Sequence, residues 1–195
     1  PDVLTPRADT ETLVETCLKQ ISSRNAALCI ADFGTGSGAI LLALLSEWPN
    51  ATGLGIDISE SALAIAMENA VRNRLSDRAD FQTGNWAEGI SDNRLDLAVS
   101  NPPYIASDVL ETLDPEVRDH EPRIALDGGA DGLGVYRILL PELFRVLKSG
   151  GRMAVEIGFD QADAVMSLAE RSGVSDIELA KDLGGQPRVV SGLKP

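Results

Sequence analysis

The sequence predicts an α/β fold built on a doubly wound, mainly parallel sheet of seven strands. Short apolar runs alternate along the chain with segments whose apolar residues recur at helical spacing. A glycine-rich turn lies between the first apolar run and the helical segment that follows it. The chain has 195 residues, of which 44% are hydrophobic, and this is enough to build one well-sized core. We therefore expect a single domain.

The first half of the chain is expected to supply four strands. A leading helix follows Thr5-Pro6-Arg7, and Asp9 and Thr10 can cap its first turn. The expected strands cover residues 28–33, 54–56, 79–82 and 95–100, with helices at 39–48 and 59–73 between them. Strands that alternate with helices in this way form parallel sheets covered on both faces.

A loop rich in Asp, Glu, Pro and Gly separates the two halves of the chain. It is roughly thirty residues long, more than a compact domain usually carries, so we expect it to be functional. The expected elements beyond it are a helix at 136–147, a turn at Ser149-Gly150-Gly151, a strand at 152–157, a helix at 160–171 and strands at 177–180 and 188–191.

The charge and hydropathy of the chain restrict its partners. Seventeen Lys and Arg against thirty Asp and Glu leave a net charge of -13, so the surface should repel phosphate backbones, and direct DNA binding is not expected. No apolar run is long enough to span a membrane, and no signal peptide is evident. We expect a soluble, monomeric, cytoplasmic protein. Because the chain starts with Pro1 rather than Met, a segment upstream is expected to be missing.

The two cysteines do not indicate a metal site. Cys17 and Cys29 lie in apolar stretches at a spacing that matches no zinc motif, and His120 alone cannot complete a ligand set with them. We expect both to be core thiols, and we expect no metal.

The glycine-rich turn indicates a nucleotide-like cofactor. It reads Gly34-Thr35-Gly36-Ser37-Gly38, and glycines let the backbone turn tightly and approach a ligand while helix N–H groups face it. Asp57 ends the next strand, where a carboxylate can accept hydrogen bonds from both ribose hydroxyls. The glycines alone also fit a relaxed dinucleotide fingerprint, or a tight turn without a ligand.

Two further residues near the turn have two interpretations each. Asp32 could be satisfied by backbone amides at the end of its strand, or it could face the amino group of a methionine moiety. Trp86 follows the short third strand, where it could contact an adenine ring or cap the core.

The segment Asn101-Pro102-Pro103-Tyr104 has the position and composition of an active site. It follows an apolar strand, and ligands of open α/β sheets collect at the carboxyl ends of strands. The side-chain oxygen of Asn101 and the carbonyl of Pro102 can accept both protons of one NH2 group, while Tyr104 stacks on its plane. Amide and aromatic amine nitrogens are poor nucleophiles. For a reaction at such a nitrogen, we expect most of the rate enhancement to come from holding the nitrogen and aiming it at the atom that it attacks. A plain proline turn with Tyr104 in the core is the alternative.

These residues together resemble the class I methyltransferases, and more closely the bacterial release factor glutamine methyltransferase family. The resemblance extends over nearly the whole chain. It is carried by residues 4–11, by the turn at 32–38, by 100–105, by Glu121-Pro122, Ala125-Leu126, Gly128-Gly129 and Asp131-Gly132 in the long loop, and by Glu156-Ile157-Gly158.

The resemblance implies a fold, a cofactor and a substrate. The fold would be the Rossmann-like sheet of that class, with an antiparallel last strand, and the cofactor would be S-adenosylmethionine. It would be bound by Asp32, Gly34, Thr35, Gly36, Ser37, Gly38, Asp57, Trp86 and Asn101. Asn101, Pro102, Pro103 and Tyr104 would hold the glutamine of a Gly-Gly-Gln motif in a peptide chain release factor, with Asn101, Pro102 and Tyr104 as the catalytic residues. The resemblance also implies a small N-terminal helical domain, which we expect to be absent here.

Several other functions remain open from the sequence. An adenine amine methyltransferase acting on DNA or RNA would share the tetrapeptide, although no basic cluster is present. A ribosomal-protein glutamine methyltransferase is closer, and a cofactor-binding or NAD-binding module without methyl transfer is also compatible with the glycine turn. The chain itself contains Gly184-Gly185-Gln186, which we interpret as a turn before the last strand rather than a self-methylation site.

Overall fold

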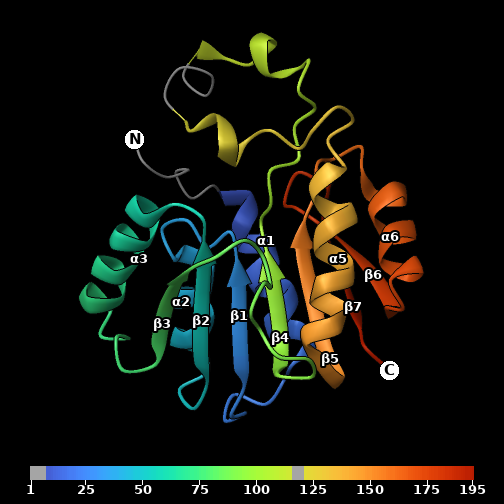
Figure 1. Ribbon diagram of the computed structural model, residues 1–195. Helices are drawn as coiled ribbons and strands as arrows, with labels where there is room; N and C mark the ends of the chain where they lie inside the picture. The colour runs from blue at the N-terminus through green and yellow to red at the C-terminus, as the bar shows by residue number, and fades with distance from the viewer. Residues whose placement is uncertain (1–7, 116–120) are drawn as a thin grey trace.

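The computed structural model describes residues 8–115 and 121–195, which form a seven-stranded sheet (Figure 1). The strand order is β3-β2-β1-β4-β5-β7-β6. The strands are β1 (Cys29–Phe33), β2 (Thr52–Asp57), β3 (Ala79–Thr83), β4 (Leu95–Ser100), β5 (Leu147–Glu156), β6 (Ser175–Lys181) and β7 (Pro187–Leu193). β7 pairs antiparallel with β5 and β6, and the pairs from β3 across to β5 are parallel. The expected fold class, including the antiparallel last strand, is confirmed.

Helices cover both faces of the sheet, as alternating strand and helix segments require. They are α1 (Ala8–Gln20), α2 (Ala39–Glu47), α3 (Glu60–Arg72), α5 (Gly134–Val146) and α6 (Ala162–Arg171). In Figure 1, α5 lies in front of the sheet while α1 and α2 lie behind it. The core is correspondingly split in two: Ile30 of β1 packs with Leu13 of α1, and its neighbours Ala31 and Phe33 pack on the α5 side. Successive side chains of a buried strand point to opposite faces, which explains the split.

Two local expectations differ from the structure or fall outside it. The expected cap at Asp9 involves a side chain outside the described part of the structure. Thr10 is not an N-cap, because α1 already includes Ala8, and its hydroxyl donates to Glu156. The expected turn at Ser149-Gly150-Gly151 lies within β5, which begins at Leu147. Gly150 has a φ of 79°, so the strand contains an irregularity there rather than ending.

The long segment after β4 lies above the carboxyl ends of the strands (Figure 1). Its described part contains two short 3-10 helices, Leu110–Thr112 and Arg123–Ala125. Its base is closed by backbone hydrogen bonds, in which the Ile105 N–H donates to the Leu126 carbonyl at 3.0 Å and the Gly128 N–H donates to the Ile105 carbonyl at 2.8 Å. The segment is therefore anchored at its base next to β4.

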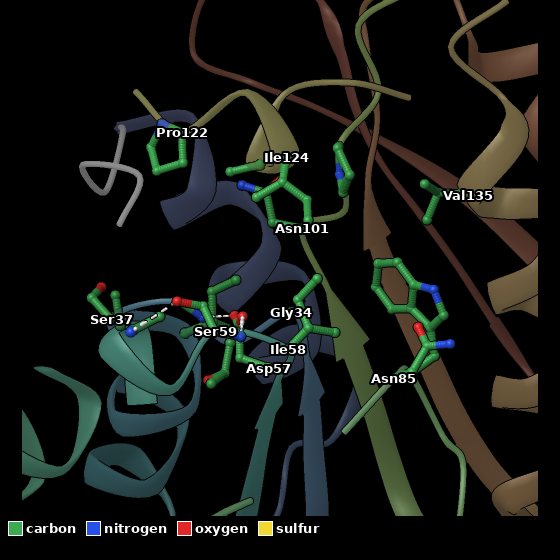
Figure 2. A pocket seen from close by; sticks show the side chains of 18 of the residues that line it. Gly34, Ser37, Asp57, Ile58, Ser59, Asn85, Asn101, Pro122, Ile124 and Val135 are labelled. Atoms are coloured by element: carbon green, nitrogen blue, oxygen red, sulfur yellow. Dashed lines mark hydrogen bonds between the residues drawn. The ribbon is translucent and has the colours of Figure 1, made fainter. Parts of the chain in front are cut away.

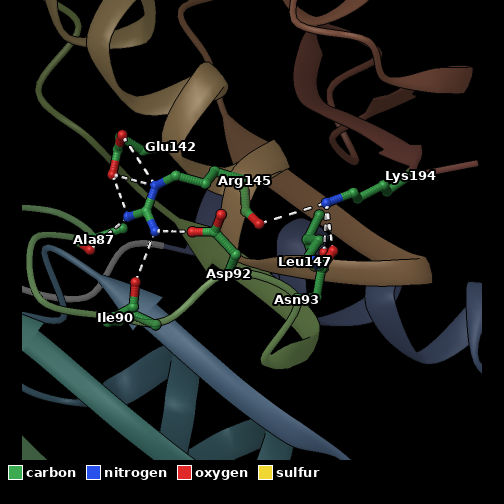
Figure 3. A network of polar contacts seen from close by, with 8 residues as sticks. All are labelled: Ala87, Ile90, Asp92, Asn93, Glu142, Arg145, Leu147 and Lys194. Atoms are coloured by element: carbon green, nitrogen blue, oxygen red, sulfur yellow. Dashed lines mark hydrogen bonds and ion pairs between the residues drawn. The ribbon is translucent and has the colours of Figure 1, made fainter.

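Arg145 of α5 fastens the connection between β3 and β4 (Figure 3). Its guanidinium donates to the carbonyls of Ile90 at 2.7 Å and Ala87 at 2.9 Å. The same group is paired with the carboxylates of Asp92 at 2.7 Å and Glu142 at 2.6 Å. Because this connection begins with residues that line the cavity described below, Arg145 supports one of its walls from behind.

Both cysteines are free, and they differ in burial. Cys17 is fully buried, and burial raises the pKa of its thiol to about 12, while Cys29 is partly buried and also free. Within residues 8–115 and 121–195, no three His, Cys, Asp or Glu side chains gather as a metal site would require. No helix in the described part of the chain is both long and apolar enough to cross a membrane.

Candidate functional site

A cavity of about 360 Å³ opens at the carboxyl ends of the central strands (Figure 2). Ligands of open α/β sheets bind at this edge, and the volume falls within the ordinary range of small-molecule sites. Its walls come from the turn after β1, the end of β2, the residues after β3 and the residues after β4, together with Thr10 and parts of the long segment. Sequence segments that were predicted separately therefore meet in one cavity.

The turn after β1 is held from below by the neighbouring strand. The Gly34 and Thr35 N–H groups both donate to the carbonyl of Ile56, at 2.8 and 2.9 Å. Gly34, Thr35, Gly36 and Ser37 line the cavity. One side of the turn is hydrogen-bonded to β2, and the opposite side faces the cavity.

The three glycines have positive φ angles, and their surroundings differ. A Cβ on Gly36 (φ 55°) would meet no atom within 4 Å, so it would extend into open cavity space. A Cβ on Gly34 (φ 70°) would approach the Trp86 ring at 3.6 Å, and one on Gly38 (φ 78°) would lie 3.2 Å from the Ala66 side chain. Gly36 thus keeps space for a ligand, whereas Gly38 permits close packing of α2 and does not itself line the cavity.

Asp57 joins the turn to the start of α3. Its Oδ2 accepts from the Gly36 N–H at 2.9 Å, and its Oδ1 accepts from the Ser59 N–H at 2.9 Å. Each carboxylate oxygen can accept more than one hydrogen bond, so both retain capacity toward the cavity that Asp57 lines. The residue both shapes the turn and offers acceptors to a ligand.

Asp32 lies beneath the turn and does not line the cavity. It is fully buried, and its Oδ2 accepts from the Thr35 hydroxyl at 2.7 Å. Burial raises the pKa of this carboxyl to about 7, although the Thr35 hydrogen bond acts in the opposite direction. The Leu41 backbone N–H also lowers this pKa, although Oδ1 makes no hydrogen bond of ordinary geometry with the described residues. Asp32 therefore supports the turn through Thr35 and keeps one unused acceptor.

The position of Trp86 is compatible with both interpretations of the sequence. It lines the cavity and also packs against the core on the α5 side. Its φ is 50°, a left-handed conformation that is rare for a bulky residue. Backbone strain of this kind persists where the surroundings fix it, and it is common at ligand sites.

The tetrapeptide after β4 is divided between the cavity and the core. Asn101 and Pro103 line the cavity, while Pro102 is buried. The Tyr104 ring packs against the core, and its hydroxyl donates to Glu156 Oε1 at 3.5 Å. The Tyr104 carbonyl accepts from Gln161 Nε2 at 2.9 Å, which ties the end of the motif to the start of α6.

Several lining residues were not predicted as site residues. Thr10 was expected only as a helix cap, and Ile58, Ile124 and Asp127 were assigned no role, yet all four line the cavity. Figure 2 shows Asn101 and Ile124 on one side of it and Asp57 with Ile58 on the other. Ile58 directly follows Asp57, so the signal that found the carboxylate could have found its neighbour.

Asp127 adds a negative charge to the cavity wall. Its Oδ1 accepts from the Ser107 hydroxyl at 2.6 Å and from the Gly129 N–H at 3.0 Å. The Ser107 hydrogen bond, followed by that of Gly129, lowers the pKa of this carboxyl below its usual value. It therefore stays ionised at neutral pH.

The Gly184-Gly185-Gln186 sequence forms the turn between β6 and β7. The Gly185 N–H donates to the Asp182 carbonyl at 2.9 Å, the Gln186 N–H donates to Asp182 Oδ1 at 2.9 Å, and Gly185 has a φ of 81°. None of its residues lines the cavity. The interpretation as a turn is confirmed.

Several solved structures with the same fold are named as methyltransferases or methylases. A methyltransferase from Pyrococcus furiosus superposes with a TM-score of 0.72 at 18% identity, covering 100% of this chain and 86% of that one. A ribosomal protein L11 methylase from Lactobacillus delbrueckii subsp. bulgaricus superposes with a TM-score of 0.69 at 19% identity, covering 100% and 82%. At these identities the similarity establishes the fold alone.

Comparison with related sequences identifies the family more specifically than the fold does. Residues 25–176 match the family described as "Methyltransferase domain". The chain is 52% identical to the release factor glutamine methyltransferase of Caulobacter vibrioides, covering 99% of this chain and 66% of that protein. It is 40% identical to the protein of the same name from Cereibacter sphaeroides, covering 100% and 68%. The chain thus spans about two thirds of the length of these relatives, and it belongs to the release factor glutamine methyltransferase family.

Proposed function

We propose that this chain transfers a methyl group from S-adenosylmethionine to the side-chain amide nitrogen of the glutamine in a release factor Gly-Gly-Gln motif. One observation carries the proposal: Asn101 and Pro103 share a cavity with Gly36 and Asp57. An amide-binding motif thereby adjoins a turn suited to a nucleoside ligand. The relatives named as release factor glutamine methyltransferases support the same substrate.

The residues around the turn fit S-adenosylmethionine, which supplies an electrophilic methyl group when bound. Gly36 leaves open space beside the turn, and Asp57 has acceptors left for ribose hydroxyls. The Trp86 side chain offers an aromatic surface for adenine. Asp32, with a buried and unpartnered Oδ1, is the candidate for the charge of the methionine amino group, acting from beneath the turn.

The residues after β4 would hold the glutamine amide. The Asn101 side-chain oxygen and the Pro102 carbonyl each accept one amide proton, which fixes the nitrogen and aims it at the methyl carbon. Tyr104 would complete the clamp by contact with the amide plane. Positioning of this kind requires no strong base before transfer, because the nitrogen would lose its proton to solvent only after the N–CH3 bond forms and the S–CH3 bond breaks, with S-adenosylhomocysteine as the leaving group. Well-oriented pairs gain on the order of 7–11 kcal/mol from positioning.

The test is label transfer from methyl-labelled S-adenosylmethionine to a release factor. One reaction contains the wild-type factor, and the other contains the factor with its Gly-Gly-Gln glutamine changed to Ala. We expect label on the wild-type factor only. Label on both would place the modified atom elsewhere, and label on neither, with cofactor binding intact in a calorimetric control, would contradict the proposed substrate.

Two competing substrates are tested in the same way. A ribosomal protein would take the label if the chain were a ribosomal-protein glutamine methyltransferase, and adenine-containing DNA or RNA would take it if the target were an aromatic amine. The net charge of -13 disfavours nucleic acid, and a gel shift at low salt would reveal direct binding.

We further propose that the protein acts as a monomer in the cytoplasm, with the release factor as its protein partner.

A further inference from the structure

Three side chains from distant parts of the chain form a hydrogen-bonded series at the edge of the cavity. The hydroxyl of Thr10, which lies on α1, donates to Oε2 of Glu156 at 3.0 Å. Glu156 is the last residue of β5. The Asn101 Nδ2 group, after β4, donates to the same Thr10 oxygen at 3.4 Å. Glu156 is only 1% exposed, so the series ends in a buried carboxylate.

The chemistry of these groups determines which way the Asn101 amide faces. A hydroxyl has one proton, and the Thr10 proton is donated to the Glu156 carboxylate, which only accepts. The Thr10 oxygen can therefore only accept from its other neighbour. The Asn101 group that faces Thr10 must be the NH2, which turns Oδ1 away from Thr10.

This orientation matters because packing alone does not select it. The oxygen and nitrogen of an Asn amide are nearly the same size, and rotation about χ2 is broad and roughly two-fold. A rotated Asn101 would present NH2 to the substrate NH2, and two donors cannot form a hydrogen bond. Only the hydrogen-bonding partners of Asn101 can hold the productive orientation.

We propose that Thr10 and Glu156 are positioning residues that fix the Asn101 amide with its oxygen toward the substrate. The proposal rests on the proposed function, because it assigns Asn101 Oδ1 the role of acceptor for a substrate amide proton. Glu156 also accepts from the Tyr104 hydroxyl at 3.5 Å, so one carboxylate contacts both the Thr10 series and the end of the tetrapeptide. Both residues act through Asn101 and do not contact the reacting atoms.

The kinetic test compares Thr10→Val with a matched change in the same helix. Thr16→Val also removes a buried hydroxyl from α1, but that hydroxyl donates to the carbonyl of Thr12 at 2.7 Å and lies outside the cavity. We expect Thr10→Val to lower kcat by roughly 10- to 100-fold with KM for the release factor and cofactor affinity nearly unchanged. Thr10→Ser should recover most of the activity, and Thr16→Val should behave as wild type. Equal kcat in Thr10→Val and Thr16→Val would overturn the proposal.

Glu156→Gln tests the direction of the series. A Gln side chain can donate to the Thr10 oxygen, which frees the Thr10 proton to be donated to Asn101 and draws Oδ1 inward. We expect a fall in kcat similar to that of Thr10→Val. Full activity in Glu156→Gln would show that the direction of these hydrogen bonds does not matter and would contradict the proposal.

A measurement without turnover separates this proposal from the proposed function. The side-chain NH2 of Asn101 is observed by nitrogen-15 NMR and assigned from its loss in Asn101→Asp. We expect its resonances to move in Thr10→Val and Glu156→Gln but not in Thr16→Val. If the wild-type chain does not methylate the release factor, the proposed function fails, and the NMR comparison still decides the orientation. Unmoved Asn101 resonances in Thr10→Val would overturn the inference in either case.

Discussion

The two halves of the cavity are built by different means. On the β1 and β2 side, the turn is shaped by backbone hydrogen bonds to Ile56 and by three glycines with positive φ. On the β4 side, the site depends on side chains: Asn101 contacts Thr10, and Thr10 contacts Glu156. The first half is defined within a short stretch of sequence, and the second brings together residues from α1, β4 and β5.

This difference matches two different tasks, the binding of a cofactor and the orientation of a substrate. A nucleoside cofactor is recognised by backbone N–H groups and a carboxylate, which need shape more than adjustable side chains. A substrate amide must be oriented to within a fraction of an ångström and a few degrees, which requires side chains locked by their neighbours. Substitutions on the first side should therefore change cofactor affinity or stability, and those on the second should change turnover.

The largest effect is expected on the β4 side. Asn101→Ala removes an acceptor that holds the substrate amide, so kcat should fall by roughly 10²–10³-fold, as when one donor is removed from an oxyanion hole. Steady-state methylation of a release factor measures it. Asn50→Ala, at an exposed position outside the cavity, is the control and should retain wild-type turnover. Wild-type turnover by Asn101→Ala would rule out the proposed clamp.

On the β1 side of the cavity, we expect the next largest effect at Asp32, on the free energy of unfolding. Because burial raises the pKa of Asp32 to about 7, the native state holds a proton that the unfolded state has released between about pH 4 and pH 7. The contribution of Asp32 to the free energy of unfolding should therefore fall as pH rises through this window and level off above it. Asp32→Asn lacks this titration, so its advantage over wild type should grow by up to about 4 kcal/mol from pH 4 to pH 8.

Urea unfolding of both proteins at several pH values measures this difference. The Asn side chain keeps an acceptor for the Thr35 hydroxyl, so the comparison isolates the charge. A constant difference between the two proteins across pH 4–8 would mean that Asp32 titrates near its usual range.

The same contrast separates what the sequence predicts from what it does not. The bounds of β4 agree with the sequence-based expectation, and the glycine turn was located, because strand burial and positive φ leave local signals. The contact between Thr10 and Glu156 joins positions 146 residues apart, and no local pattern indicates it. Thr10 was expected as a helix cap because its type and position permit one, but α1 begins at Ala8, so Thr10 lies inside the helix, where its hydroxyl donates to the buried Glu156 carboxylate.

The irregularity in β5 also depends on contacts between residues that are distant in the sequence. Ser149-Gly150-Gly151 has the composition of a turn, but Leu147 and Arg152 on either side of it both pair with β4, so the segment is an irregularity within one strand. Tertiary pairing overrides local preference in this case. Glu156 was named only as part of the family motif Glu156-Ile157-Gly158, and its contact with Thr10 left no local signal.

A smaller effect should follow from filling the cavity beside the turn. Gly36→Ala places a methyl group in open space and adopts a strained left-handed conformation, so cofactor affinity should fall by roughly tenfold, or about 1.4 kcal/mol. Gly185→Ala is a matched control, because Gly185 also has a positive φ and open surroundings but lies in the turn between β6 and β7. Both variants should lose about 1 kcal/mol of stability. Calorimetry should find weaker cofactor binding only in Gly36→Ala, and equal affinities would mean that this space is not used.

The smallest effect concerns the aromatic wall. Trp86→Phe keeps an aromatic ring of smaller area, so cofactor affinity should fall by about two- to tenfold. The chain has two tryptophans, and Trp48 is fully buried outside the cavity, so each single substitution leaves one reporter. Cofactor should change the fluorescence of Trp48→Phe, which retains Trp86, and leave that of Trp86→Phe unchanged. A response that persists in Trp86→Phe would show that the ligand rearranges the core around Trp48, and the first half of the cavity would then be less rigid than its backbone hydrogen bonds indicate.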